Sequence, residues 1–316
     1  MNTGTSKSPL SFLIMACIAL VSMLVTATTY AQIYVSQSPG TSAGSVLQFD
    51  AAGHFQDTFL SGLSINVYGL SVDASNNVYT SDFGGYTVYK NAPDKTQLLS
   101  IFANSTSSFQ AVANATNIYV AYFGATQVDK YTSAGTGATL AISIASPAAL
   151  AFDPTGTYLY AASYSATAGA SKIVRYNVAT GFYADFITGL TGAAGLAVDS
   201  SGNLYVSTIS AAGATDVVTR YDSSGHNGTT FASSLTDPYG LAIADGYLYV
   251  ANAGANSVGR YLLSNGSGSS TFINGLTYAD YGVTVAPSPI PEPSSIALLC
   301  IGGVAFASWR LRRRNS

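Results

Sequence analysis

Short runs of alternating apolar and polar residues fill most of the chain, separated by turn-forming Asp, Asn, Ser and Gly. A period of two residues is typical of a strand that buries one face, and each run is too short for a globular helix. The stretch Asp199-Ser-Ser-Gly-Asn203, followed by Leu-Tyr-Val, shows the arrangement of a tight turn leading into a strand,. The pattern predicts an all-β protein of short antiparallel strands.

The runs recur in a fixed order. The clearest marker is an apolar-Tyr-apolar strand whose tyrosines lie 40 to 45 residues apart, at Tyr34, Tyr79, Tyr119, Tyr160, Tyr205 and Tyr249. A strand like Gly195-Leu-Ala-Val-Asp199 precedes this marker in most repeats, a strand ending in an aromatic residue follows it, and a strand like Phe59-Leu-Ser-Gly-Leu63 comes last. Four short strands in a repeat of this length predict a β-propeller of six blades.

The order of the markers predicts how the ring closes. The repeats begin at Ile33-Tyr-Val35 without an inner strand, and they end at Tyr281-Gly-Val-Thr-Val285, an inner strand without a following tyrosine strand. The two ends therefore complete one blade and hide edges that would otherwise expose unpaired backbone. We expect a propeller over 32–286, a signal peptide over 1–31 and a sorting or anchor segment over 287–316.

The N-terminus has the features of a secretory signal: Lys7, an apolar run over 10–25 and small residues before Gln32,. Cleavage is predicted between Ala31 and Gln32, with cleavage after Ala27 as the alternative, and export by a Sec-type machinery follows. Lipidation of Cys17 is a further alternative, although this residue precedes much of the apolar run.

The C-terminus has three parts. Pro291-Glu292-Pro293 is followed by an apolar stretch over 294–309 and then by four arginines, Arg310, Arg312, Arg313 and Arg314. The apolar stretch would extend roughly 24 Å as a helix, short of the ~30 Å of a bilayer core, so thinning of the bilayer would have to accompany its insertion. The arginines would hold the C-terminus in the cytoplasm because each is costly to place inside a bilayer.

This tail resembles the PEP-CTERM sorting signal of Gram-negative bacteria. The resemblance implies recognition and cleavage by exosortase, a membrane-embedded protease. It also implies transient anchoring in the cytoplasmic membrane, followed by delivery to the outer surface or to an exopolysaccharide matrix. The alternative is an ordinary C-terminal anchor that is retained.

Charge and cysteine content limit the chemistry of the body. From residue 32 to residue 290 there are seven Lys or Arg against fourteen Asp, a net charge near −7 that disfavours nucleic acid,. Both cysteines, Cys17 and Cys300, lie in the terminal segments, so the body has neither a disulfide nor a thiol. The repeats are similar to those of NHL-type and gluconolactonase-like propellers, and such lactonases use a divalent cation held by Glu, Asn and Asp.

Candidate catalytic and metal-binding residues are few. His54 and His226 occupy the same hairpin turn of two blades, away from the central loops where virginiamycin-B-lyase-like propellers place a histidine, so no catalytic residue is predicted. The body also has no Glu. Asp82 and Asn252 follow tyrosine strands and have oxygen ligands suited to Ca²⁺, as have Ser207 and Asn114, with capping of local backbone as the alternative. No cofactor is predicted, with Ca²⁺ as the alternative.

Tyrosines outside the repeat phases are the candidate ligand contacts, because exposed tyrosines stack on sugar rings and hydrogen-bond through their hydroxyls. They are Tyr68, Tyr122, Tyr164, Tyr239 and Tyr281. We therefore expect a non-enzymatic exported propeller that binds protein or polysaccharide in the cell envelope or extracellular matrix. The alternative is an extracellular lactonase-like or lyase-like enzyme.

Overall fold

The structure, a computed structural model, describes residues 31–38, 43–64, 66–102, 107–210, 216–277 and 279–286. The side chains of Phe102 and of 279–281 are not among them. The predicted signal peptide, the Pro291-Glu292-Pro293 segment, the apolar tail and the terminal arginines lie outside these residues. Within the described ranges, no helix is long and apolar enough to cross a bilayer.

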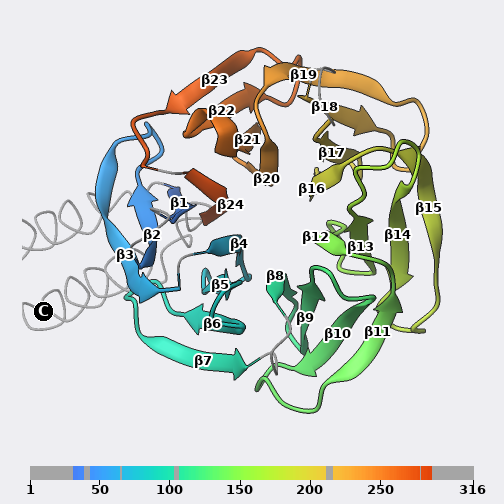
Figure 1. Cartoon of the computed structure of the whole chain (residues 1–316), viewed down its shortest axis with the longest axis horizontal. Coiled ribbons are helices and arrows are strands. Elements are labelled where there is room, and N and C mark those ends of the chain that lie inside the picture. Colours follow the sequence, from blue (N-terminus) through green and yellow to red (C-terminus); the bar gives the residue numbers. More distant parts are fainter. Residues whose placement is uncertain are drawn as a thin grey trace, which may run out of the picture. The chain divides into compact units, whose positions relative to one another are not determined.

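The described residues form six four-stranded antiparallel sheets arranged around a central opening (Figure 1). The prediction of a six-bladed β-propeller is therefore confirmed. In the order from the centre outwards, the first blade is β24 (Ala279–Ala286), β1 (Gln32–Gln37), β2 (Gly44–Phe49) and β3 (Phe55–Leu63). The second is β4 (Val67–Val72), β5 (Val78–Asp82), β6 (Thr87–Asn91) and β7 (Gln97–Phe102). The third is β8 (Ser108–Ala113), β9 (Asn117–Tyr122), β10 (Gln127–Thr132) and β11 (Thr139–Ser143).

The remaining three blades repeat this order. The fourth is β12 (Pro147–Phe152), β13 (Tyr158–Ser163), β14 (Ser171–Asn177) and β15 (Tyr183–Leu190). The fifth is β16 (Ala193–Val198), β17 (Leu204–Thr208), β18 (Asp216–Tyr221) and β19 (Thr229–Leu235). The sixth is β20 (Pro238–Ala244), β21 (Tyr247–Asn252), β22 (Ser257–Leu262) and β23 (Gly268–Ile273), with a single 3₁₀ turn, Ala253–Ala255, between β21 and β22.

The first blade joins the two ends of the ring, as the sequence predicts. β24 pairs antiparallel with β1, with Gln32 opposite Ala286 and Ile33 opposite Val285. We call the end of the channel where the six inner strands begin the start face, and the end where they finish the end face. Because Ala286 ends an inner strand and Gln32 lies opposite it, the chain enters and leaves the propeller at the end face.

The repeated tyrosines form the core of the blades. Tyr34, Tyr119 and Tyr205 are each less than 2% exposed, and their rings pack against residues of neighbouring strands and blades. In the third blade, for example, Tyr119 contacts Phe152 and Tyr176 of the fourth, at ring centroid distances of 5.7 and 5.9 Å. The apolar packing that closes the ring therefore lies between adjacent blades.

The turn between the first two strands of a blade is fixed by an aspartate. Asp73 accepts hydrogen bonds from the backbone N–H groups of Ser75 and Asn77, at 2.9 and 3.0 Å, and from the Tyr79 hydroxyl at 3.3 Å. Lys90, opposite Tyr79 in the next strand, places its Nζ 3.1 Å from the same carboxylate. Asp199 repeats the bonds to backbone and tyrosine, so these aspartates act as structural turn residues.

Candidate functional site: an aromatic mouth of the central channel

The central channel is wide at both ends and nearly closed in the middle. A cavity of about 200 Å³ opens at the start face and another of about 190 Å³ at the end face. Between them all six blades converge on a neck of about 20 Å³. A water needs ~10–15 Å³ of such space, so the neck admits about one water molecule and nothing the size of a ligand.

The neck is narrow because small residues let neighbouring inner strands approach each other. At equivalent register positions four blades carry glycine, namely Gly69, Gly195, Gly240 and Gly282, and the other two carry Gln110 and Ala149. A Cβ on Gly195 would lie 1.9 Å from the Tyr239 carbonyl oxygen of the next blade, and one on Gly69 would lie 2.3 Å from that of Phe109. Gln110 instead accepts a hydrogen bond from the Leu150 N–H at 2.6 Å, which ties the third blade to the fourth.

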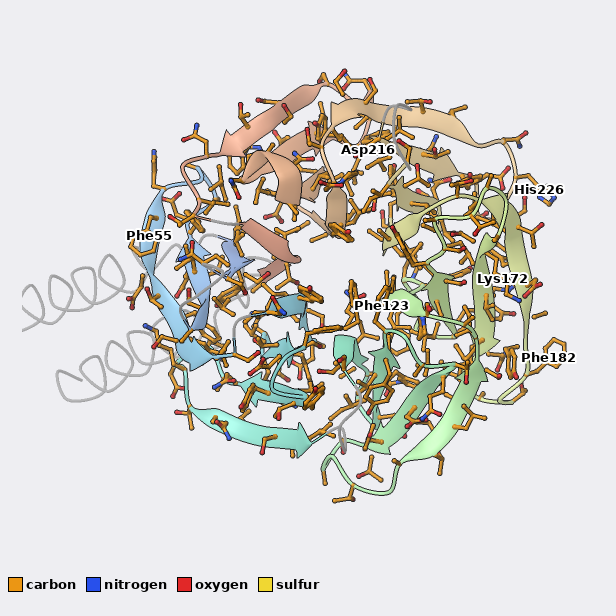
Figure 2. The ribbon with its side chains drawn as sticks, viewed as in Figure 1. Phe55, Phe123, Lys172, Phe182, Asp216 and His226 are labelled. Atoms are coloured by element: carbon orange, nitrogen blue, oxygen red, sulfur yellow. The ribbon has the colours of Figure 1, made fainter. Side chains whose placement is uncertain are left out.

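Six aromatic residues and one alanine line the start-face cavity: Tyr68, Phe83, Phe109, Phe123, Tyr164, Tyr239 and Ala148. We call this set the aromatic mouth. Its rings form a continuous series across three blades, in which Tyr68 is 4.5 Å from Phe83, Phe109 is 5.1 Å from Phe123, and Phe123 is 5.9 Å from Tyr164. Figure 2 shows Phe123 beside the central opening, whereas Phe55, Phe182 and His226 lie at the periphery of the ring.

β-Bulges direct half of the aromatic mouth toward the axis. Near the start of every inner strand the pairing register shifts, as between Ser108 and Gln110, so that one extra residue, or two in the first blade, stands out of the ladder,. By register these positions are Tyr68, Phe109, Ala148, Ala194, Tyr239 and Tyr281. The side chain of Tyr281 lies outside the described residues.

The other half of the aromatic mouth comes from the turns that follow the second strand of a blade. Phe83, Phe123 and Tyr164 come directly after β5, β9 and β13. The aromatic mouth is consequently asymmetric. Rings crowd the second, third and fourth blades, while the bulge positions of the fourth and fifth blades hold only Ala148 and Ala194.

Among the described residues, the lining of the aromatic mouth contains no Asp, Glu, Lys, Arg or His. Its polar side-chain groups are the hydroxyls of Tyr68, Tyr164 and Tyr239. An uncharged cup of ring faces and hydroxyls favours a neutral ligand with both an apolar face and hydrogen-bonding groups.

Three of the five predicted tyrosines, Tyr68, Tyr164 and Tyr239, line this cavity. The prediction for Tyr122 is wrong, because its side chain is 2% exposed and its hydroxyl bonds to that of Tyr131 inside the third blade. Tyr122 ends a strand whose next residue, Phe123, lines the cavity instead. Adjacent residues in an extended chain point to opposite faces of the sheet. A prediction that is wrong by one position therefore selects a core residue in place of a surface residue.

The predicted metal candidates make hydrogen bonds to backbone groups. Asp82 is 3% exposed and accepts hydrogen bonds from the N–H groups of Ser64 and Gly85, both at 3.0 Å, as well as from the Ser64 hydroxyl. The Asn252 amide donates to the Ser270 carbonyl on the outer strand β23. Each of the two side chains is thus held by polar groups of its own or an adjacent loop or strand, which is the arrangement that the backbone-capping alternative describes.

Ser207 and Asn114 are also held by hydrogen bonds to backbone. The Ser207 hydroxyl donates to the Tyr239 carbonyl of the neighbouring blade at 3.4 Å. Asn114 accepts bonds from the N–H groups of Thr116 and Asn117 in a turn. Within the described ranges, no three His, Cys, Asp or Glu side chains gather closely enough to share a metal ion.

The two histidines stand in hairpin turns, as the sequence predicts. The His54 N–H donates to Asp50 at 2.9 Å, and the His226 N–H donates to Asp222 at 3.0 Å, so both turns have the same aspartate cap. Hydrogen bonds from Ser224 and from the His226 backbone hold the pKa of Asp222 well below its usual range. His54 and His226 do not line the aromatic mouth.

Sequence reasoning missed Phe83, Phe109 and Phe123. The signal for two of them is their position directly after the second strand of a blade, where Phe83 and Phe123 each precede a glycine. Phe109 occupies the bulge position that Tyr68 fills in the preceding blade. The prediction named tyrosines only, so it did not include phenylalanines at the equivalent positions of other blades.

Comparisons with known structures agree with this architecture. The chain is similar to a chain in the crystal structure of a nidogen/laminin complex, with a TM-score of 0.70 and 15% identity over 82% of this chain and 99% of that one. It is also similar to hydrazine synthase from Kuenenia stuttgartiensis, with a TM-score of 0.54 and 16% identity over 73% of this chain and 76% of that one. Likeness at such identities shows the propeller fold alone. No curated protein matches the chain in sequence.

The chain thus belongs by structure to the six-bladed β-propellers. Its residues 289–314 match the PEP-CTERM protein-sorting motif, which confirms the resemblance of the C-terminal segment. The motif implies an exported protein that passes through the membrane and is processed by an exosortase-like membrane protein.

Proposed function

We propose that this exported propeller is a non-enzymatic binding protein whose aromatic mouth holds an extracellular ligand. The observation that carries the proposal is the series of aromatic rings at the start face, to which the described lining adds hydroxyls and one alanine. Ligand sites in proteins are concave and mostly apolar, with a few polar groups that fix orientation. The aromatic mouth has this composition.

The placement of the ionisable side chains supports binding rather than catalysis. Proton transfer requires an acid or base within hydrogen-bonding reach of the substrate. The histidines lie in hairpin turns, and the carboxylate of Asp82 is occupied by Ser64 and Gly85. The described groups at the aromatic mouth instead suit stacking and hydrogen bonding.

The route of the chain leaves the aromatic mouth accessible during sorting. The chain enters and leaves the propeller at the end face, where Gln32 pairs with Ala286, and the aromatic mouth opens at the start face. Only Pro287 to Ile290 separate Ala286 from the Pro-Glu-Pro segment. A protein tethered through this segment can therefore bind its ligand before cleavage as well as after it.

For sorting, we expect Sec-type export, transient anchoring with the C-terminus in the cytoplasm, and cleavage near Pro291 to Pro293. The mature protein then reaches the outer surface or the exopolysaccharide matrix. Intact-mass measurement of the protein from its native host tests this course. A species from Gln32 to the Pro291–Pro293 region is expected, whereas a species with the full C-terminus would show a retained anchor.

The binding role is tested with the body, residues 32–288, and exopolysaccharide extracted from the host. Affinity electrophoresis should show retardation that is lost in the Phe83→Ala/Phe123→Ala double variant. Phe182→Ala is the matched control, because Phe182 is an aromatic residue that is 71% exposed but follows the third strand of its blade at the end face. Equal binding by all three proteins would contradict a role of the aromatic mouth.

Turnover measurements address the enzymatic alternative. The body is incubated with a panel of lactones, with and without Ca²⁺, and product formation is followed. We expect no turnover above the uncatalysed rate. Hydrolysis that is abolished by a chelator would overturn the non-enzymatic assignment.

A further inference from the structure

The aromatic mouth has room for one ring. Its volume is about 200 Å³. This space suits a single sugar residue or one amino-acid side chain and is smaller than the ~300 Å³ at which pockets for drug-sized ligands begin. A polymer can therefore place only one of its units inside.

The neck limits how that unit enters. The space below the aromatic mouth falls to about 20 Å³ where Gly69, Gly195 and Gly282 bring the inner strands together. A polymer cannot pass through the ring, so the aromatic mouth is a cup with a closed base. A cup of this kind accepts the end of a chain or the tip of a branch, whereas the middle of a chain requires a groove that is open on two sides.

The asymmetry of the aromatic mouth selects a flat apolar face. Phe83 and Phe123, both packed against the buried ring of Phe109, form a wall on the second and third blades, and the smaller Ala148 stands at the bulge position of the adjacent fourth blade. A sugar ring has one face rich in C–H groups and a periphery of hydroxyls. Its C–H face can stack on the wall while its hydroxyls reach Tyr164 and Tyr239.

The chemistry of the lining separates sugars from other ligands. An anionic sugar or a charged side chain would lose hydration without meeting an opposite charge among the described lining residues,. Proline-rich peptides bind aromatic grooves in an extended conformation, which a closed cup does not accommodate. A neutral sugar residue satisfies the volume, the closed base and the uncharged lining together.

We infer that the aromatic mouth binds the terminal or branch-tip sugar residue of an uncharged polysaccharide end-on. The inference rests on the proposed function and adds the class of ligand and the manner in which it enters. It predicts that the number of chain ends, and not the mass of polymer, determines binding.

The test is competition for immobilised host exopolysaccharide. Soluble exopolysaccharide is offered intact or after partial hydrolysis, at equal mass, with non-reducing ends counted chemically. Inhibition should rise in proportion to the number of ends, and a disaccharide released from the polymer should compete about as well per mole as a hexasaccharide. A hexasaccharide that competes at least about tenfold better per mole would overturn end-on binding.

Two variants make it possible to distinguish a loss of binding from a failure to fold. Phe123→Ala removes part of the wall and should weaken binding about tenfold, the effect of losing one good stacking partner. Ala148→Phe retains every ring of the aromatic mouth but fills the space beside residue 148, and it should also abolish binding. The fold is expected to accept it, because the equivalent bulge positions hold Tyr68 and Phe109. Circular dichroism and Phe182→Ala serve as controls.

The outcomes separate this inference from the proposed function. Binding that depends on the aromatic mouth but not on the number of ends would overturn end-on recognition alone. Preference for oligogalacturonate over neutral fragments would overturn the uncharged ligand, and binding activity destroyed by protease treatment of the extract would show a protein ligand. Polymer binding unaffected by either variant would contradict the proposed function itself.

Discussion

Ile33 lies opposite Val285 in one sheet, although nearly the whole propeller separates them in sequence. Val283 and Val285 are 2% and 4% exposed and pack with Ile33 and Val35 in one apolar cluster. The last strand therefore supplies the inner wall of the blade with which the chain begins, and closure of the ring depends on residues just before the sorting segment.

Removal of the strand and removal of the tail are expected to have opposite consequences. A body ending at Ser288 should unfold in urea at the midpoint of a longer chain, since no described strand is lost. A body ending at Thr277 loses β24, and burial of Val283 and Val285 alone contributes about 3–6 kcal/mol. Urea titration followed by circular dichroism measures the difference. Equal midpoints for the two truncations would show that the clasp does not stabilise the ring.

Gly195→Ala should destabilise the neck. Its Cβ would stand 1.9 Å from the Tyr239 carbonyl oxygen, so two inner strands would have to separate. Overpacking of this kind costs about 1–3 kcal/mol, and binding at the aromatic mouth should weaken as well because Tyr239 is displaced. Ala149→Gly, at the equivalent position of the fourth blade, is the control and should cost no more than about 1 kcal/mol. The free energy of unfolding is measured for both.

Asp73 should make the stability depend on acid pH. Burial by itself would raise the pKa of Asp73, but hydrogen bonds from the Asn77 side chain and backbone and from Lys90 outweigh it and lower the pKa below 3.8. A lowered pKa means that the stabilisation is present above the unfolded value and is lost as pH falls through the folded value. Asp73→Ala should cost about 1–3 kcal/mol at neutral pH, mostly through unpaired Lys90 and turn N–H groups.

The comparison with wild type across pH checks this assignment. The difference in unfolding free energy between wild type and Asp73→Ala should shrink as pH falls below 3.8. Asp94→Ala is the control at an exposed turn and should have a smaller effect. A difference for Asp73→Ala that stays constant down to strong acid would rule out the carboxylate as its origin.

Tyr205 should make the stability of the fold depend on pH in the alkaline range. Burial and the neighbouring Asp199 raise its pKa to about 12, in spite of the opposing charge of Arg220. A raised pKa means that its contribution to stability is complete below about pH 10 and is lost as pH rises through about 12,. Phenolate absorbance should therefore report Tyr205 only near pH 12 or on unfolding, and Tyr205→Phe should raise the pH of alkaline unfolding.

Tyr86→Phe provides the comparison, since Tyr86 is 37% exposed and lies in a turn. It should leave the pH of alkaline unfolding unchanged. If Tyr205→Phe unfolds at the same pH as wild type, ionisation of Tyr205 does not limit alkaline stability.

The sequence by itself determined the strands, their grouping into six repeats and the closing blade. These features depend on the local alternation of apolar and polar residues, on turn residues and on the order of the repeat markers. All three can be read directly along the sequence. Asp73 and Asp199 were recognisable as turn residues for the same reason, because their partners lie within a few positions. The sorting segment could also be recognised from the sequence, as the match over residues 289–314 shows.

Only the tertiary structure decided which aromatics meet. Tyr68 and Tyr239 belong to blades far apart in sequence, and the channel axis brings them to one cavity. Bulges at the start of the inner strands break the alternation that would otherwise predict their direction,. Tyr122 and Phe123 are an example, because they are adjacent in the chain. Tyr122 is buried in the core of the blade, whereas Phe123 lines the cavity.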